Sequence, residues 1–241
     1  FILVNYANSD MVGHTGNLEK TVQAIKCVDN CLKKLVESAK KQNYDVVITD
    51  EPTYSGIGRT IREEIVYKNG RNYSAAMQIQ AYSLDRLTNM QRIVIPSLTH
   101  GLTVIQSRCL ASTLAYQGIQ ERKKSGKNMD ELWGEILDHE GNQVQLTYRP
   151  DLLIIPTIDD IDELIRRLNL RATRTKDDNS IFDSLEFQKE LKPIYEGEDL
   201  CKIFEKRGTK VEYLSTGISE DQTREQARGI YQRFLNSLSE D

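Results

Sequence analysis

This sequence has little of several residue types and patterns that mark particular protein classes. It contains four cysteines in 241 residues, and Cys27 and Cys31 lie one helical turn apart, so no disulfide framework is indicated. No apolar run approaches the roughly 20 residues that span a membrane, and we expect no secretion signal. The net charge of −4 lacks the basic excess typical of nucleic-acid-binding proteins. We therefore expect a cytoplasmic protein without nucleic-acid or membrane partners.

The composition is that of a protein with a substantial buried core. Apolar residues make up 39% of the chain and charged residues 28%, which is the balance of an ordinary globular domain. We find neither an internal repeat nor a low-complexity linker. A chain of this length then fits one large domain, or one domain with a small appendage.

Short apolar runs alternate with helical patterns along the chain. The runs are rich in β-branched residues and predict buried strands at residues 1–6, 45–49, 102–107, 151–157 and 210–216. The helical patterns cover residues 18–39, 73–98 with a stop near Pro96, 110–119, 128–138, 158–171, 183–206 and 218–237. This alternation predicts a three-layer, doubly wound α/β fold around a parallel sheet of about five strands.

Polar motifs follow the predicted strands, at the sheet edge where such folds bind ligands. The sequence DEPT at 50–53 precedes GIGRTIREEI, and the long helix carries Tyr82 and the pair Asp85-Arg86. Further on come SRC at 107–109, STLAYQG at 112–118 and a group of late arginines. In this order, the motifs of residues 49–238 resemble thymidylate kinase, a nucleoside-monophosphate kinase that transfers phosphate from ATP to dTMP in nucleotide biosynthesis.

The resemblance implies a role for each of these side chains. Arg62 and Arg108 would hold the dTMP phosphate, and arginine forks suit phosphate oxygens. Glu51 would lie near that phosphate and its Mg²⁺, so Arg108 and Glu51 are the catalytic candidates. The remaining candidates are Tyr82 against the thymine ring, Arg86 at the thymine edge, Tyr116 and Gln117 around the nucleoside, and Arg166, Arg167, Arg171 and Arg174 in a lid over ATP.

Local sequence alone also fits simpler interpretations of the same residues. Arg86 beside Asp85 fits an exposed ion pair, and Tyr82 fits a core aromatic residue. The late arginines fit a solvated helix face. Only the joint order of the motifs favours a nucleotide site.

The chain departs from the family pattern at three places. The family has GxxxxGK[ST] after its first strand, a loop whose amides and lysine hold phosphates, whereas this chain reads NSDMVGHTGNLEKT. Ser107 replaces the usual aspartate before Arg108, and a hydroxyl cannot replace a carboxylate in organising Mg²⁺. Cys109 is an unusual residue after that arginine. The sequence therefore predicts a kinase body with impaired or lost activity.

The N-terminal segment resembles a different family. Residues 1–41 are similar to cofactor-independent phosphoglycerate mutase, a two-Mn²⁺ enzyme in which the Asp and His of DMVGH bind metal. That resemblance implies Asp10 and His14 as metal ligands. The other ligands of that family are missing, so we expect no functional Mn²⁺ here.

The junction near residue 48 is compatible with one continuous domain. Both families place a strand, loop, helix and strand in this region, so residues 1–48 would supply the βαβ unit to the kinase-like body of residues 49–241. Natural recombination, an artefact of the gene model or assembly, and a deliberate chimera each predict such a junction.

Three functional hypotheses follow. The first is a thymidylate-kinase-like enzyme, weak or inactive. The second is a metal-binding piece of a phosphoglycerate mutase. The third is a pseudoenzyme that binds nucleotides or acts as a scaffold, and that forms a homodimer through the long helix.

Overall fold

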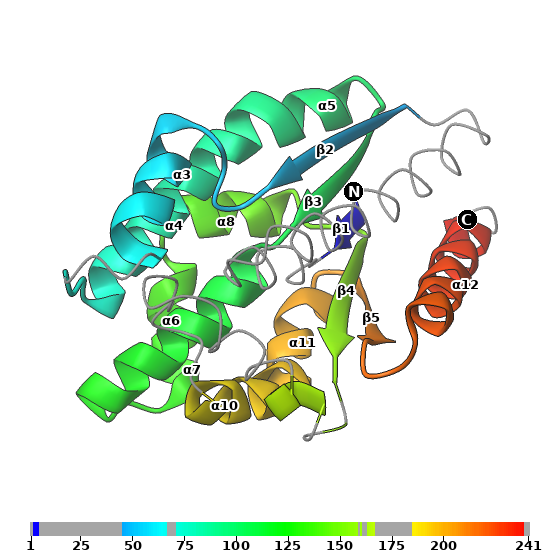
Figure 1. Ribbon diagram of the computed structural model, residues 1–241. Coiled ribbons are helices and arrows are strands. Elements are labelled where there is room, and N and C mark those ends of the chain that lie inside the picture. The colour runs from blue at the N-terminus through cyan, green and yellow to red at the C-terminus, as the bar shows by residue number, and fades with distance from the viewer. Residues whose placement is uncertain are drawn as a thin grey trace.

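A parallel five-stranded sheet forms the centre of the part of the chain that the structure describes (Figure 1). The computed structural model describes residues 2–4, 45–66, 71–158, 160, 163–166 and 185–238. The strand order is β2-β3-β1-β4-β5, and every neighbouring pair is parallel. The strands are β1 (Ile2–Val4), β2 (Val46–Asp50), β3 (Thr103–Ser107), β4 (Leu152–Thr157) and β5 (Lys210–Ser215). The predicted doubly wound α/β fold is confirmed.

Among the described residues, helices lie between the successive strands from β2 to β5, since neighbouring parallel strands need crossover connections. They are α3 (Gly56–Thr60), α4 (Ala75–Asn89), α5 (Ile95–Thr99), α6 (Leu110–Ser125), α7 (Met129–Leu137), α8 (Glu140–Thr147), α10 (Leu185–Tyr195), α11 (Glu198–Glu205) and α12 (Glu220–Leu238). Wider π-type turns at Ile61–Val66 and Met90–Val94 extend α3 and α4.

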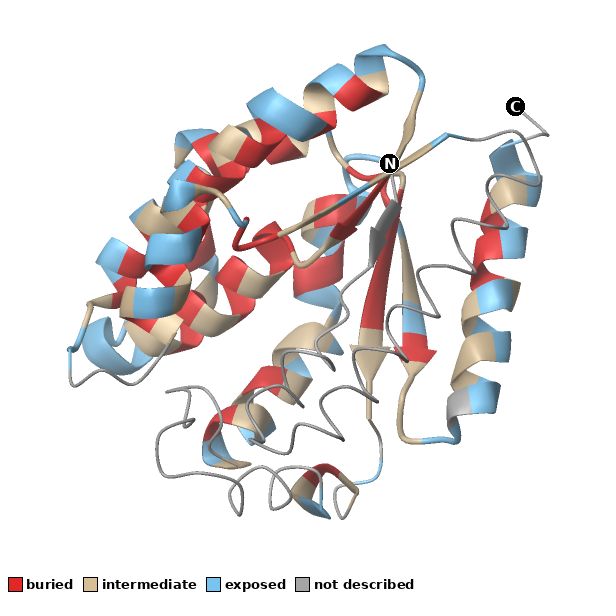
Figure 2. Cartoon of the chain, turned by 45° about the horizontal axis from the view of Figure 1, so that its top comes forward, coloured by how far each residue is buried: buried red, intermediate tan, exposed pale blue. Residues whose placement is uncertain are grey.

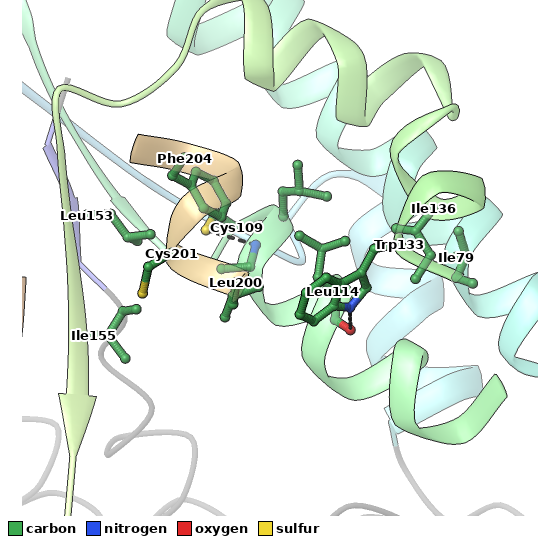
Figure 3. Packing of buried hydrophobic residues seen from close by; sticks show 12 residues of the cluster. Ile79, Cys109, Leu114, Trp133, Ile136, Leu153, Ile155, Leu200, Cys201 and Phe204 are labelled. Carbon is green, nitrogen blue, oxygen red and sulfur yellow. Dashed lines mark hydrogen bonds between the residues drawn. The ribbon is translucent and has the colours of Figure 1, made fainter. Parts of the chain in front are cut away.

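The two faces of β4 bury alternate side chains against different helices, which gives the molecule three layers (Figures 1 and 2). Leu153 and Ile155 pack with Leu114 of α6, Trp133 of α7 and Phe204 of α11 (Figure 3). On the opposite face, Leu152 and Ile154 pack with side chains of α12, namely Ile230, Tyr231 and Phe234. Alternate residues of a strand point to opposite faces, so the continuous apolar run of β4 fits a strand that is covered on both sides.

One predicted helix has the expected limits and another does not. The helical pattern at 73–98 runs from Ala75 to Thr99, and Pro96 falls in the first turn of α5, where no amide hydrogen is needed. The pattern at 183–206 forms two helices, since Gly197 caps α11 with extended backbone. A Cβ on Gly197 would lie 2.6 Å from the Pro193 carbonyl oxygen.

Helix α8 was not predicted, because its buried face is polar. Asn142 and Gln145 are fully buried, whereas Val144 and Leu146 are only partly covered. A search for apolar periodicity cannot find such a helix. Gly141 lets α8 approach α4 closely, since a Cβ at this position would lie 1.9 Å from the Ser83 carbonyl oxygen. This close packing carries Asn142 to the site described below.

Candidate acceptor site at the carboxyl edge of the sheet

The ends of β2 and β3 bring the first site residues together. Asp50 lies opposite Ser107 in the parallel register, and the Glu51 amide donates to the Ser107 carbonyl oxygen at 3.0 Å. Side chains at paired positions project on the same face of a sheet. The Asp50 carboxylate therefore lies one strand away from Ser107.

Glu51 is a buried carboxylate held between two partners. Glu51 is 4% exposed. Its Oε1 accepts a hydrogen bond from Gln106 Nε2 at 2.9 Å, and its Oε2 lies 2.8 Å from Arg86 Nη2 in an ion pair. Burial raises the pKa of Glu51, and the charge of Arg86 opposes that rise.

Arg86 is buried and belongs to a polar network. It is 1% exposed, and it donates to Asn142 Oδ1 of α8 and, at 3.1 Å, to Thr113 Oγ1 of α6. Its Nε has no hydrogen-bond partner. The geometry favours a role in fixing Glu51, and contact of Arg86 with the thymine edge stays a prediction.

The interpretation of Asp85 and Arg86 as an exposed ion pair is wrong. Asp85 is 1% exposed and accepts from the Thr53 amide at 2.7 Å and from Thr53 Oγ1 at 2.6 Å. A Cβ on Gly58 would lie 2.0 Å from the Thr53 carbonyl oxygen, so α3 packs directly on this loop. Asp85 thus fixes the loop after β2, and Arg86 fixes the carboxylate that begins it.

Arg62 lies at the same edge and is already engaged. Its Nη2 donates to Asp50 Oδ2 at 2.9 Å and to the Pro52 carbonyl oxygen. Its guanidinium carbon lies 4.6 Å from the ring centroid of Tyr54, whose side chain is exposed. The buried Nε of Arg62 has no hydrogen-bond partner. Burial raises the pKa of Asp50, and the Arg62 charge opposes this rise.

Arg108 follows β3 with a left-handed backbone, at φ 61°. A non-glycine residue is strained in this region. Gln106 Nε2 donates to the Arg108 carbonyl oxygen at 3.0 Å. The next residue, Cys109, caps α6 through Sγ, which accepts from the Ala111 amide at 3.3 Å. Burial raises the pKa of Cys109 to about 12, so this unusual cysteine is a neutral helix cap.

The residues predicted around the nucleoside lie on α4 and α6. Tyr82 is half-buried on α4. Tyr116 is half-buried on α6, and its ring centroid lies 5.7 Å from that of Phe187. Gln117 is 2% exposed and donates to Gln78 Oε1 at 3.1 Å. Gln117 is therefore a buried residue that joins α6 to α4.

Sequence reasoning missed several residues of this site. Helix α4 carries a polar stripe at 3–4 residue spacing, and Gln78 and Asn89 belong to it with Tyr82, Asp85 and Arg86. This spacing was readable in the sequence as one helix face. Gln106, Asn142 and Tyr195 carried no such signal, because tertiary packing brings them to the site.

Tyr195 of α10 is an aromatic residue near Arg108 and Tyr116. Its hydroxyl is buried and has no hydrogen-bond partner. Burial is the main cause that raises the pKa of Tyr195, and Tyr116 contributes. A buried hydroxyl without a partner marks a position where a polar ligand group would be favourable.

Several predicted residues fall outside the site or outside the described part of the chain. Arg166 is exposed and pairs with Glu163 through two contacts of 2.5 and 2.6 Å. Asp10, His14, Arg167, Arg171 and Arg174 lie outside the described residues.

The described residues form neither a metal-binding cluster nor a membrane-spanning helix. Among the residues that the structure describes, no group of three or more His, Cys, Asp or Glu side chains is placed to bind a metal ion. The described helices include none that is both long and apolar enough to cross a membrane.

Comparison with known proteins gives matches to two families, and the two matches cover very different lengths of the chain. The 2,3-bisphosphoglycerate-independent phosphoglycerate mutases of Campylobacter jejuni and Helicobacter hepaticus are 51% and 53% identical to the chain over 51 residues, 21% of this chain and only 10% of those enzymes. The thymidylate kinase of Clavibacter sepedonicus is 30% identical over 163 residues, which covers 68% of this chain and 71% of that protein.

The solved structure of thymidylate kinase from Candida albicans has the same fold, with a TM-score of 0.60 at 16% identity. The match covers 98% of this chain and 91% of that one. A family model described as Thymidylate kinase matches residues 29–212 and so begins before the junction expected near residue 48. The chain belongs to the thymidylate kinase family, and it also carries a short segment similar to phosphoglycerate mutase.

Proposed function

We propose that this chain binds dTMP at the carboxyl edge of its sheet, as the acceptor of an ancestral ATP-dependent phosphorylation to dTDP. One observation carries the proposal. Three buried polar atoms without a hydrogen-bond partner belong to this one edge, namely Arg62 Nε, Arg86 Nε and Tyr195 Oη. Buried polar atoms in proteins are nearly always hydrogen-bonded. Their concentration here supports a polar ligand.

The charges at this edge suit a nucleoside monophosphate. Arg62 and Arg108 supply the cations for the phosphate, since guanidinium forks bind phosphate oxygens. Arg62 would exchange its contact with Asp50 for the phosphate. Tyr82 and Tyr116, half-buried on neighbouring helices, supply the apolar walls for a base and sugar. Phosphoryl transfer depends mainly on such positioning and charge neutralisation.

Asp50 fits a Mg²⁺ ligand better than Glu51 does. Mg²⁺ takes oxygen ligands and usually uses one or two carboxylates together with substrate phosphates. The side chain of Asp50 is 30% exposed, against 3% for Glu51. Asp50 would hold the ion, and Glu51 would orient Arg86 and Gln106 without contacting the ion. When bound, Mg²⁺ would neutralise charge on the phosphate oxygens.

We propose that the donor side is impaired. No stretch of the 241 residues matches GxxxxGK[ST], and position 107 lacks the family carboxylate. The segment after β1 and most of the late arginines fall outside the described residues. ATP binding is therefore proposed to be weaker than dTMP binding, and the chain to work as a weak kinase or as a pseudoenzyme.

A cytoplasmic location and a homodimer are further proposals for this chain. For the homodimer, Met77 and Leu84 of α4 are 54% and 53% exposed, seven residues apart on one helix face. A metal-binding role of the mutase-like segment is the second candidate, and only its short sequence match favours it.

Calorimetry with dTMP and thymidine tests the acceptor proposal. Arg108→Ala should weaken dTMP binding by about 1.5–3 kcal/mol, the contribution of a charged hydrogen bond, and should leave thymidine binding nearly unchanged. Arg149→Ala, near the start of β4 at the opposite edge of the sheet, is the matched control and should change neither. Equal losses of dTMP and thymidine affinity in Arg108→Ala would refute the phosphate role.

A further inference from the structure

Gln106 is a fully buried glutamine at the centre of the site edge, and the proposed function gives it no role. It is 0% exposed and occupies β3 two residues before Arg108. Its Nε2 donates to Glu51 Oε1 at 2.9 Å and to the Arg108 carbonyl oxygen at 3.0 Å. Both hydrogens of one amide nitrogen are therefore used, one on a side chain of the β2 end and one on the main chain of the β3 end.

The orientation of this amide is fixed by its other partner. Gln106 Oε1 accepts from Asn89 Nδ2 at 3.5 Å, and Asn89 Oδ1 accepts from Thr49 Oγ1 at 2.7 Å. A flipped amide would place its oxygen against the Glu51 carboxyl group and against the Arg108 carbonyl oxygen, which cannot donate. The network from Thr49 to Glu51 thus permits one arrangement.

The contact with Arg108 falls on a strained residue. The backbone of Arg108 has φ 61°, a conformation that a non-glycine residue keeps only where its surroundings hold it. The Gln106 amide holds the carbonyl of that residue, and the Cys109 cap fixes the chain immediately after it. This backbone sets the direction of the Cα–Cβ bond from which the Arg108 side chain extends.

We propose that Gln106 is a positioning residue that orients Arg108 toward the acceptor phosphate and ties it to Glu51. The inference rests on the proposed function, because it needs Arg108 to bind phosphate. Because Gln106 is fully buried, it would act through Arg108 and not by binding the phosphate itself. Its loss should let Arg108 relax to an unstrained backbone, so that the phosphate contact weakens while the nucleoside contacts of α4 and α6 remain.

The ratio of dTMP affinity to thymidine affinity tests this proposal, since a general loss of stability leaves that ratio unchanged. Calorimetry on Gln106→Met should show dTMP binding weakened about tenfold, with thymidine binding changed less than about twofold. Gln106→Asn, which is too short to reach both partners, should act in the same direction with a smaller loss of stability. It keeps the test available if the methionine variant does not fold.

Thr209→Val is the matched control. The Thr209 side chain is 3% exposed, and it donates to the Pro150 carbonyl oxygen at 2.8 Å at the opposite edge of the sheet. This variant also loses one buried hydrogen bond to a main-chain carbonyl, and it should keep the wild-type ratio. A ratio that changes equally in Thr209→Val would show that the effect is structural, and it would overturn the proposal.

Two further outcomes separate this inference from the proposed function. If wild type prefers dTMP to thymidine and both Gln106 variants keep that preference, the role of Gln106 is wrong and the acceptor site stands. If wild type shows no such preference, the proposed acceptor site is wrong, and the proposed role of Gln106 is then wrong as well.

Discussion

At the scale of single residues, the site keeps a carboxylate where burial opposes its charge. Asp50 has a pKa raised above the ordinary value of 3.8, mainly by burial, and Arg62 only partly offsets this effect. A raised pKa means that the folded state binds the proton more tightly. Protonated Asp50 therefore favours the folded state fully when the pH is below the ordinary pKa. This contribution to the free energy of unfolding is lost as the pH rises through the folded-state pKa.

Asp50→Asn should therefore be more stable than wild type at neutral pH, because the variant removes a partly buried charge. The difference in free energy of unfolding between the variant and wild type should decrease as the pH falls toward the ordinary carboxyl pKa. Urea unfolding of both proteins between about pH 4 and pH 7 measures it. A variant that is less stable than wild type at neutral pH would show that the Arg62 contact outweighs burial.

Arg86 should matter for stability more than a residue that only contacts the base. Arg86→Met leaves Glu51 buried without a counter-charge, and removing one partner of a buried pair costs about 3–5 kcal/mol. Arg149→Met removes a half-exposed partner of Asp151, and such surface pairs contribute only about 0–1 kcal/mol. Chemical denaturation compares the two, and a similar small loss in both would exclude the positioning role of Arg86.

At the scale of helices, the site depends on the close packing of α8 against α4. Gly141→Ala should destabilise the protein by about 1–3 kcal/mol through overpacking, because its Cβ would meet the Ser83 carbonyl oxygen. Gly134→Ala in α7 has open space around the new Cβ and should stabilise by about 0.5–1 kcal/mol. Thermal unfolding of both variants checks the difference in sign, and a neutral Gly141→Ala would contradict this packing.

The strands and most helices were predictable because apolar periodicity reports burial directly. All five strands fall within or next to their predicted ranges, since β-branched runs such as that of β4 are covered on both faces. Helix α8 was not predictable, because Asn142 and Gln145 form its buried face. The break at Gly197 depends on tertiary packing.

The site was predictable only in part, for a related reason. Family motifs led to Glu51, Arg62 and Arg108, and the structure places all three at the ends of β2 and β3 or in the helix that follows β2. The residues that hold them, such as Gln106 and Asn142, carry no motif. They act through contacts between positions up to 56 residues apart. Such long-range contacts leave no pattern in the neighbouring sequence.

At the scale of the whole molecule, the proposed function combines a dTMP-binding edge of the sheet with a weakened ATP side. Ligand that binds only the folded state raises the melting temperature by mass action. An intact acceptor edge should therefore respond to its nucleotide more strongly than the altered donor side responds to ATP.

The thermal shift of the intact protein with dTMP and with ATP–Mg²⁺, at equal concentrations, tests this account most directly. We predict a clear stabilisation by dTMP, a smaller shift with ATP, and loss of the dTMP shift in Arg108→Ala. An equal or larger shift with ATP, or a dTMP shift that Arg108→Ala leaves intact, would contradict the account.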